Sequence, residues 1–300
     1  MRFTKMHGIG NDYVYVNCFD QTVDHPEQWA RTLSDRHFGI GSDGLILILP
    51  SAQADVRMRM FNADGTEGEM CGNGVRCVAK YACEHNLVES RPCVKPHLLE
   101  LLKSALDDAR DHREITVQTG RGVLTLALAL INDKVQYVCV DMGEPLLLPG
   151  DIPVNVVGQQ AVGVPLSIQN QNLLMTCVSM GNPHVVFFCP DVQTVDLEHI
   201  GPLIENHRLF PQRTNVHFAQ VIAPDEVKIR TWERGSGITL ACGTGACAVC
   251  VAGTLASKTK RRLTAHLPGG DLQLHWNDQD NHVYMVGPAV ELFSGDWTAA

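Results

Sequence analysis

Short apolar segments recur along the whole chain, and their spacing predicts a fold rich in β-strands. Most of these segments alternate apolar and polar residues or form brief continuous runs of Val, Ile and Leu between turn residues. The predicted strands cover residues 3–6, 13–17, 45–49, 56–61, 115–117, 123–130, 135–140, 173–179, 185–188, 216–221, 226–232, 263–267, 272–276 and 283–286. A chain with this many short strands and few helices is expected to be an α+β protein.

Four segments have helical spacing instead. Residues 26–37, 72–82 and 243 to about 256 predict three helices, and the last two begin at glycine-rich turns. Residues 95–113 are highly charged, and their apolar side chains share one face (Leu98, Leu102, Ala105 and Ala109). This pattern predicts an exposed amphipathic helix.

Two of the predicted helices start with the same short motif. Residues 71–74 read Cys-Gly-Asn-Gly and residues 242–245 read Cys-Gly-Thr-Gly. Each motif follows a strand and a polar loop, and each leads into an apolar helix of small residues. A Leu- and Pro-rich segment at 144–153 lies between them and is a plausible crossover. The chain is therefore expected to contain two halves of similar design.

A cysteine at the start of a helix is a candidate for chemistry. Unpaired N–H groups and the positive end of the helix dipole stabilise a thiolate there, and glycines let an anion approach the backbone closely. If the halves face each other, Cys71 and Cys242 would flank one carbon beside a bound carboxylate. One thiolate would remove a proton from one side while the other thiol delivers a proton from the opposite side, without a cofactor.

Other motifs favour simpler interpretations. Cys77, Cys83, Cys247 and Cys250 lie inside apolar helices and are expected to pack there. The Cys-x-x-Cys pair at 247–250 has no second pair to complete a zinc site. Residues 39–44 fit Gly-x-Gly-x-x-Gly, but a strand follows them, whereas a dinucleotide site needs a helix at that point.

Composition excludes several classes of protein. Of the 300 residues, 45% are hydrophobic and 19% are charged, which is typical of globular proteins. The net charge of −9 argues against nucleic-acid binding and against a polybasic membrane anchor. No apolar run is long enough to span a bilayer, and the first residues lack the pattern of a secretory signal. We therefore expect the 11 cysteines to be reduced in a cytoplasmic protein.

Taken together, the motifs resemble those of the diaminopimelate epimerase family. The matching segments run through nearly the whole chain, at 7–13 (HGIGNDY), 61–65 (FNADG), 69–77 (EMCGNGVRC), 180–184 (MGNPH), 213–216 (RTNV), 232–237 (WERGSG), 240–246 (LACGTGA) and 287–289 (GPA). Any one of these segments is weak evidence, but all of them in order are specific.

The resemblance implies a fold and an activity. The fold would have two pseudo-symmetric α+β domains, each a curved mixed or antiparallel, barrel-like sheet around a central helix, with the active site between them. The domains would be residues 1–140 with 287–300, and residues 141–286. The activity would be cofactor-independent epimerisation of LL-2,6-diaminopimelate to the meso form, with no metal, in a homodimer.

The resemblance also implies roles for individual residues. Cys71 and Cys242 correspond to the two catalytic cysteines, and Glu233 and His184 to residues that assist proton transfer. Gly72, Asn73, Gly243 and Thr244 would hold the carboxylate at the reacting carbon. The other predicted substrate contacts are Asn11, Asn62, Asn182, Asn215, Glu233 and Arg234, chiefly around the distal end of the substrate, where arginine suits a carboxylate.

Two positions and one segment depart from the pattern of the family. Some members have Gln in place of Gly44, and most have Glu in place of His217, next to Asn215. Residues 92–113 resemble an insertion, which we interpret as an elaborated surface loop, with a partner-docking helix as the alternative.

Two other functions fit part of the pattern. Proline racemases and hydroxyproline epimerases also use two cysteines, but Asn73 stands where those enzymes are expected to have His. The pair Glu233 and Arg234 suits a second amino-acid head group that proline lacks. An amino-acid-binding protein without catalysis is the alternative from another class, and the intact pair Cys71 and Cys242 argues against it.

Overall fold

The chain folds into two compact units. The computed structural model describes residues 1–169 and 171–298. Unit 1 consists of Met1–Asp141 together with the residues from Val286 onward, and unit 2 is Met142–Met285. Strand β18 (Val283–Pro288) carries the chain from unit 2 back to unit 1.

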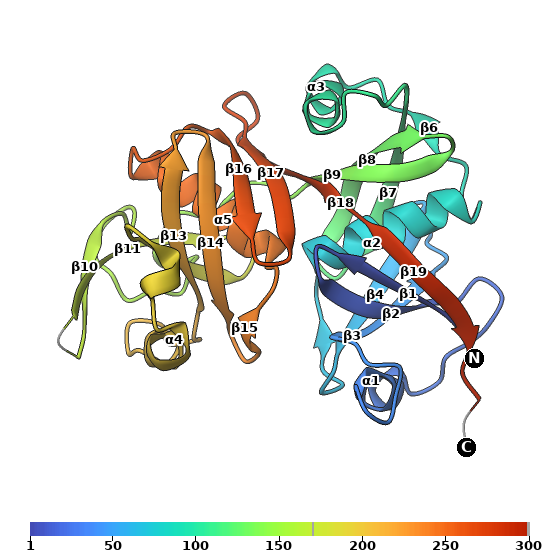
Figure 1. The fold of residues 1–300 in the computed structure, drawn as a ribbon, viewed down its shortest axis with the longest axis horizontal. Coiled ribbons are helices and arrows are strands. Elements are labelled where there is room, and N and C mark those ends of the chain that lie inside the picture. Colours follow the sequence, from blue (N-terminus) through green and yellow to red (C-terminus); the bar gives the residue numbers. More distant parts are fainter. Residues whose placement is uncertain (170, 299–300) are drawn as a thin grey trace. The chain divides into compact units, whose positions relative to one another are not determined.

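Unit 1 is built on one mixed sheet. Its elements in chain order are β1 (Arg2–Gly8), β2 (Asn11–Asn17), α1 (Pro26–Ser34), β3 (Gly44–Leu49), β4 (Val56–Asn62), β5 (Glu67–Gly68), α2 (Gly72–Glu84), β6 (Arg91–Pro92), α3 (Pro96–Ala105), β7 (Asp111–Thr119), β8 (Gly122–Ile131), β9 (Lys134–Asp141) and β19 (Val290–Asp296). The strands pair in the order β19-β1-β2-β3-β4-β7-β8-β9, with β2/β3 and β4/β7 parallel. The last strand therefore returns to the first one (Figure 1).

A helix packs on each face of the sheet of unit 1. Ala30 and Leu33 of α1 cluster with Val14 and Leu45 on one face. Ile46, the next residue along β3, points to the other face and contacts α2 at Gly74. Because both faces are covered, β3 is an almost continuous apolar run rather than an alternating one.

Unit 2 repeats this plan. Its elements are β10 (Val164–Ile168), β11 (Gln171–Ser179), β12 (Pro183–Phe188), the 3₁₀ helix η1 (Val192–Thr194), α4 (Leu197–Glu205), β13 (Asn215–Ala223), β14 (Glu226–Glu233), β15 (Gly237–Thr239), α5 (Gly243–Leu255), β16 (Arg262–Leu267) and β17 (Gly270–Trp276). The strands pair in the order β10-β11-β12-β13-β14-β16-β17, with β12/β13 and β14/β16 parallel. Helix α4 joins the apolar cluster on one face, and α5 contacts β11, β12, β13, β16 and β17.

The two units share one topology. Strands β1, β2, β3, β4, β7 and β8 correspond to β11, β12, β13, β14, β16 and β17, with the same parallel pairs at the same places. Helices α1 and α4 occupy the same connection, as do α2 and α5 (Figure 1). The predicted similarity of the two halves is therefore confirmed at the level of strand order.

The structure confirms the α+β class and corrects several local predictions. The helices at 72–82 and 243–256 are present as α2 and α5. The long exposed helix predicted at 95–113 is wrong, because α3 ends at Ala105 and β7 starts at Asp111. The apolar face of the segment is buried, as the amphipathic pattern implies, since Leu98, Leu101 and Leu102 are buried and α3 contacts β8 and β9. The strand pairings within each unit leave its sheet open in the described residues.

Candidate functional site

The two motif cysteines occupy equivalent places. Cys71 is the N-cap residue of α2, with φ −130° and ψ 118°, and Cys242 is the N-cap residue of α5, with φ −121° and ψ 104°. Extended backbone at this position brings the side chain back over the first turn of the helix, where N–H groups lack helical acceptors. Each unit therefore presents one thiol at the start of its central helix.

In unit 1, the environment of Cys71 is polar and built around amides. The Gly74 N–H donates to Cys71 Sγ at 3.3 Å, and the thiol of Cys71 donates to Asn11 Oδ1 at 3.4 Å. Asn73 Nδ2 donates to the same Asn11 oxygen at 3.3 Å. Asn11 Nδ2 in turn donates to Asp43 Oδ2 at 2.8 Å. The structure thus brings together three of the predicted site residues, Cys71, Asn11 and Asn73.

Gly74 is a requirement of this packing. A Cβ at that residue would lie 2.7 Å from Ile46 Cδ1 and 3.6 Å from Cys71 Sγ. A side chain there would have to displace the end of the Ile46 side chain, next to the turn that caps the sulfur. The glycine in the Cys-Gly-x-Gly motif therefore lets the helix start lie directly against the sheet.

In unit 2, Cys242 belongs to a chain of polar side chains. Its sulfur lies 3.7 Å from Thr244 Oγ1, and Asn182 Nδ2 donates to that hydroxyl at 3.3 Å. Asn182 Oδ1 lies 2.9 Å from His184 Nε2. Four predicted site residues, Cys242, Thr244, Asn182 and His184, are thus joined by successive contacts.

This chain of polar side chains continues into the interior through His217 and Thr231, which had no predicted role. His184 Nδ1 lies 2.9 Å from His217 Nε2, and His217 Nδ1 lies 2.9 Å from Thr231 Oγ1. Both imidazoles are fully buried. Burial lowers the pKa of His217 to about 3, so this ring is neutral at physiological pH. His217 was singled out only as a departure from the family, and Thr231 was missed because its contact depends on strand register.

The imidazole of His217 lies directly on the start of α5. A Cβ built on Gly245 would lie 2.2 Å from His217 Cε1. We therefore expect Gly245→Ala to lower the free energy of unfolding by about 1–3 kcal/mol, because the buried ring has no room to move. Thermal denaturation measures this loss. Gly150→Ala is the matched control, since the structure has no described atom within 4 Å of that Cβ, and an unchanged Tm for Gly245→Ala would contradict the contact.

His217 should also make the protein less stable in acid. The unfolded state binds a proton at this residue near pH 6.5, whereas the folded state does so only near pH 3. The unfolded state therefore holds more protons between these values, so stability falls as the pH falls below 6.5. Through this residue, the free energy of unfolding is about 2 kcal/mol lower at pH 5 than at pH 7.5.

Urea titrations at the two pH values test this linkage. The loss of stability between pH 7.5 and pH 5 should be about 2 kcal/mol smaller in His217→Gln than in the parent protein. The control is His266→Gln. Desolvation is the largest single effect on His266 and lowers its pKa, but the hydrogen bonds and charges of Asp271 and Glu226 together outweigh it and raise the pKa, so the contribution of His266 has the opposite sign. Equal acid sensitivity of His217→Gln and the parent would disprove the prediction.

The remaining predicted residues lie at the ends of strands β4, β13 and β14. Asn62 Nδ2 donates to Thr66 Oγ1 at 3.0 Å, and Thr239 Oγ1 donates to Glu233 Oε1 at 2.6 Å. Asn215 is buried, donates to the Pro183 carbonyl and accepts from the Arg234 N–H, both at 2.9 Å. Asn215 therefore fixes the backbone at the start of β12 and the end of β14, which orients Arg234.

Most of the other thiols are poor nucleophiles. Burial raises the pKa of Cys77 to about 11 and that of both Cys177 and Cys250 to about 12. Cys18, also desolvated, has a pKa of about 11. The prediction that Cys77 and Cys250 pack within helices is confirmed, since both are fully buried.

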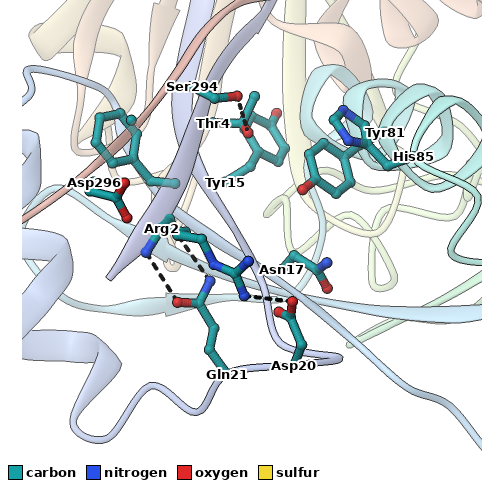
Figure 2. A pocket seen from close by; sticks show the side chains of 12 residues that line it. Arg2, Thr4, Tyr15, Asn17, Asp20, Gln21, Tyr81, His85, Ser294 and Asp296 are labelled. Carbon is teal, nitrogen blue, oxygen red and sulfur yellow. Dashed lines mark hydrogen bonds and ion pairs between the residues drawn. The ribbon is translucent and has the colours of Figure 1, made fainter.

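A pocket of about 340 Å³ lies elsewhere in unit 1 (Figure 2). Residues from β1, β2, α2 and β19 line it, among them Arg2, Tyr15, Tyr81 and His85. The rings of Tyr81 and His85 stack with their centroids 3.9 Å apart. No predicted site residue lines this pocket, so it is not part of the candidate site.

Searches for two other features complete the description. No helix among the described residues is long and apolar enough to cross a membrane. The same residues contain no group of three or more His, Cys, Asp or Glu side chains arranged to hold a metal ion.

Comparisons with known proteins give one consistent result at the level of sequence. A sequence model of the family described as "Diaminopimelate epimerase" matches residues 3–148 and 176–292. The chain is 50% identical to the diaminopimelate epimerase of Agathobacter rectalis, with 99% of each chain covered. It is 49% identical to that of Acetivibrio thermocellus, over 99% of this chain and 98% of the relative.

Solved structures with much lower identity share the fold. A probable proline racemase from Agrobacterium radiobacter superposes with a TM-score of 0.69 at 13% identity, covering 100% of this chain and 93% of that one. A PhzF-family phenazine biosynthesis protein from Bacillus anthracis gives a TM-score of 0.67 at 14% identity, covering 100% and 99%. One architecture thus carries several kinds of chemistry, and the site residues distinguish them.

Proposed function

This chain belongs to the diaminopimelate epimerase family, and on that premise we propose that Cys71 and Cys242 are the base and the acid of its reaction. The chain is an isomerase that acts on diaminopimelate. The observation that supports the two residues most directly is their equivalence. Each is the N-cap of the central helix of its unit, at the same point of the same topology.

The reaction inverts one α-carbon of the substrate. One cysteine, as the thiolate, takes the α-proton, and the other, as the thiol, delivers a proton to the opposite face. The first sulfur ends as a thiol and the second as a thiolate, so the two exchange roles when the reaction runs in reverse. The reaction therefore removes one proton and delivers another, and it transfers no electrons.

The substrate carboxylate at the reacting carbon must carry the charge that develops when the proton leaves. We assign this task to the backbone N–H groups at the two helix starts, from Gly72 and Asn73 of α2 and from Gly243 and Thr244 of α5. Helix N-termini hold fixed donors and positive potential, which stabilise an anion without reorganisation. Glu233 and His184 would assist proton transfer.

The distal amino-acid group of the substrate needs its own contacts. We assign its carboxylate to Arg234 and its ammonium group to Glu233, with Asn11, Asn62 and Asn182 as amide partners. The contacts of Asn215 support a more specific role. Because Asn215 Oδ1 accepts the Arg234 N–H, it helps to orient the backbone from which the guanidinium extends.

We further propose that the protein is a cytoplasmic homodimer. Strand β19 pairs with β1. The side chains of Leu292 and Phe293 on β19 are about half exposed. A strand with exposed apolar side chains is a suitable surface for a second copy of the chain.

Deuterium incorporation at the α-carbon tests the proposed function. Reduced protein in heavy water is incubated with LL-diaminopimelate and, in parallel, with L-proline, and both are followed by NMR. We expect exchange in diaminopimelate only, together with the appearance of the meso form. Exchange in proline alone would move the assignment to the proline racemases, and no exchange by folded, reduced protein would leave only a binding function.

A further inference from the structure

The buried polar side chains behind Cys242 form one continuous hydrogen-bonded chain within unit 2. It runs from Thr231 on β14 through His217 on β13 and His184 on β12 to Asn182, then to Thr244 and Cys242 at the start of α5. The successive distances are 2.9, 2.9, 2.9, 3.3 and 3.7 Å, and the last is within range for sulfur. We name this set of six residues the Thr231–Cys242 chain.

The chemistry of the groups restricts the direction of these bonds. Asn182 Oδ1 only accepts, so His184 Nε2 carries a proton. When His184 accepts at Nδ1, His217 Nε2 carries a proton, and His217 Nδ1 accepts from the Thr231 hydroxyl. Thr244 Oγ1 accepts from Asn182 Nδ2, which leaves the hydroxyl proton of Thr244 for the sulfur of Cys242.

We propose that Thr231 and His217 are positioning residues, which fix the direction of the chain so that the Thr244 hydroxyl donates to the thiolate of Cys242. This inference rests on the proposed function of Cys242. It explains why Thr231 and His217 are buried and hydrogen-bonded although neither residue contacts the sulfur or the substrate. All five donors point toward the sulfur at a helix N-terminus, where negative charge is most stable.

The packing supports this role. His184 and His217 are fully buried and Thr231 is 3% exposed, so solvent cannot replace any of their bonds. His217 pairs directly with Thr231 across the antiparallel strands β13 and β14. Gly245 in the first turn of α5 leaves room for the His217 ring. The helix start and the direction of the chain are therefore fixed by the same ring.

The reverse direction is the alternative. Both imidazoles would then carry their proton on Nδ1, the Asn182 amide would be turned over, and Cys242 would donate as a thiol. Heavy-atom positions alone do not tell which way an amide is turned or which nitrogen of an imidazole carries the proton. The two directions differ in the tautomers of His184 and His217, so a measurement of the tautomers decides between them.

Nitrogen NMR of the unmodified protein tests the direction. The sample is labelled with ¹⁵N-histidine, and long-range proton–nitrogen spectra are recorded between pH 6 and pH 8. We expect His184 and His217 to be neutral tautomers protonated on Nε2 throughout. The signals are assigned by comparison with His217→Gln. A proton on Nδ1 of His184 or of His217, in a neutral or a doubly protonated ring, would overturn the proposal.

The reactivity of Cys242 tests the effect on the sulfur. The rate of iodoacetamide alkylation at Cys242 is measured by peptide mass spectrometry in a Cys71→Ala background. His217→Gln should keep the rate within twofold, because the amide donates to His184 and accepts from Thr231 as the imidazole does. His217→Leu and Thr231→Val should each slow alkylation about fivefold, the equivalent of one hydrogen bond.

These readouts are independent of turnover. If the Cys242 reaction slows equally in His217→Gln and His217→Leu, the ring acts only through its volume and the proposal fails. If alkylation and tautomers follow the prediction while Cys242→Ser remains fully active, the chain is as described and the catalytic assignment fails. Where a variant does not fold, the NMR result on the parent protein still decides the direction.

Discussion

Replacing either motif cysteine by serine is expected to reduce epimerisation of diaminopimelate by about 10³-fold or more. A serine hydroxyl is far too weak an acid to form the base at neutral pH, and loss of a general acid or base removes about 10²- to 10⁴-fold in rate. Serine preserves the shape of the side chain at each N-cap, so the fold of Cys71→Ser and of Cys242→Ser should be unchanged. Turnover is measured by the appearance of meso-diaminopimelate, and folding by circular dichroism.

The two variants also separate the steps of the reaction. Each retains one cysteine, which can still remove or return a proton on its own side. With substrate deuterated at the α-carbon, we therefore expect the rate of deuterium exchange without inversion to fall less than the rate of epimerisation. One variant should exchange the LL form faster, and the other variant should exchange the meso form faster. Cys18→Ser is the matched control, because its thiol is held protonated and lies outside the motifs. Undiminished turnover in either motif variant would remove that cysteine from the mechanism.

The sequence predicted the two helix starts well because local chemistry fixes them. Glycines at 72, 74, 243 and 245 follow each cysteine, and helices α2 and α5 begin there as expected. The repeated topology could also be anticipated from the repeated motif. Strand β10 and helix α4 were missed, since they lie in segments where no short pattern distinguishes them from loops.

The failed prediction at residues 95–113 has a clear physical cause. Leu98, Leu102, Ala105 and Ala109 predicted a helical apolar face, and α3 does bury Leu98 and Leu102 and contact β8 and β9. The pattern does not reveal that the segment Asp111–Thr119 pairs with β8 along its whole length. Long-range strand pairing outweighed local helical spacing, and it ended the helix early.

Long-range contacts also limited what the sequence could predict about the candidate site. The family motifs identified Asn182, His184 and Thr244, and the structure joins them to Cys242. The partner of His184 could not be found in this way, because His217 and Thr231 reach it only through the register of β12, β13 and β14. The family motifs predict the substrate contacts, and the fold adds the buried residues that are hydrogen-bonded in series to His184.

Oxidation should abolish activity completely and reversibly. In the proposed reaction both sulfurs act on the same α-carbon from opposite sides, and we predict from this that they can form a disulfide when the substrate is absent. A disulfide removes the thiolate and the thiol together. We expect activity to fall to background after treatment with a mild oxidant and to return fully with dithiothreitol.

The other thiols make this experiment selective. Cys77, Cys177 and Cys250 are buried and stay protonated far above neutral pH, so they react slowly with oxidants. Peptide mapping should find Cys71 joined to Cys242 in the inactive protein, and bound substrate should slow the loss of activity. Full activity in protein whose Cys71 and Cys242 are quantitatively joined would rule out a mechanism that uses both thiols. Inactivation of Cys18→Ser at the parental rate would show that the loss does not depend on a half-buried thiol outside the motifs.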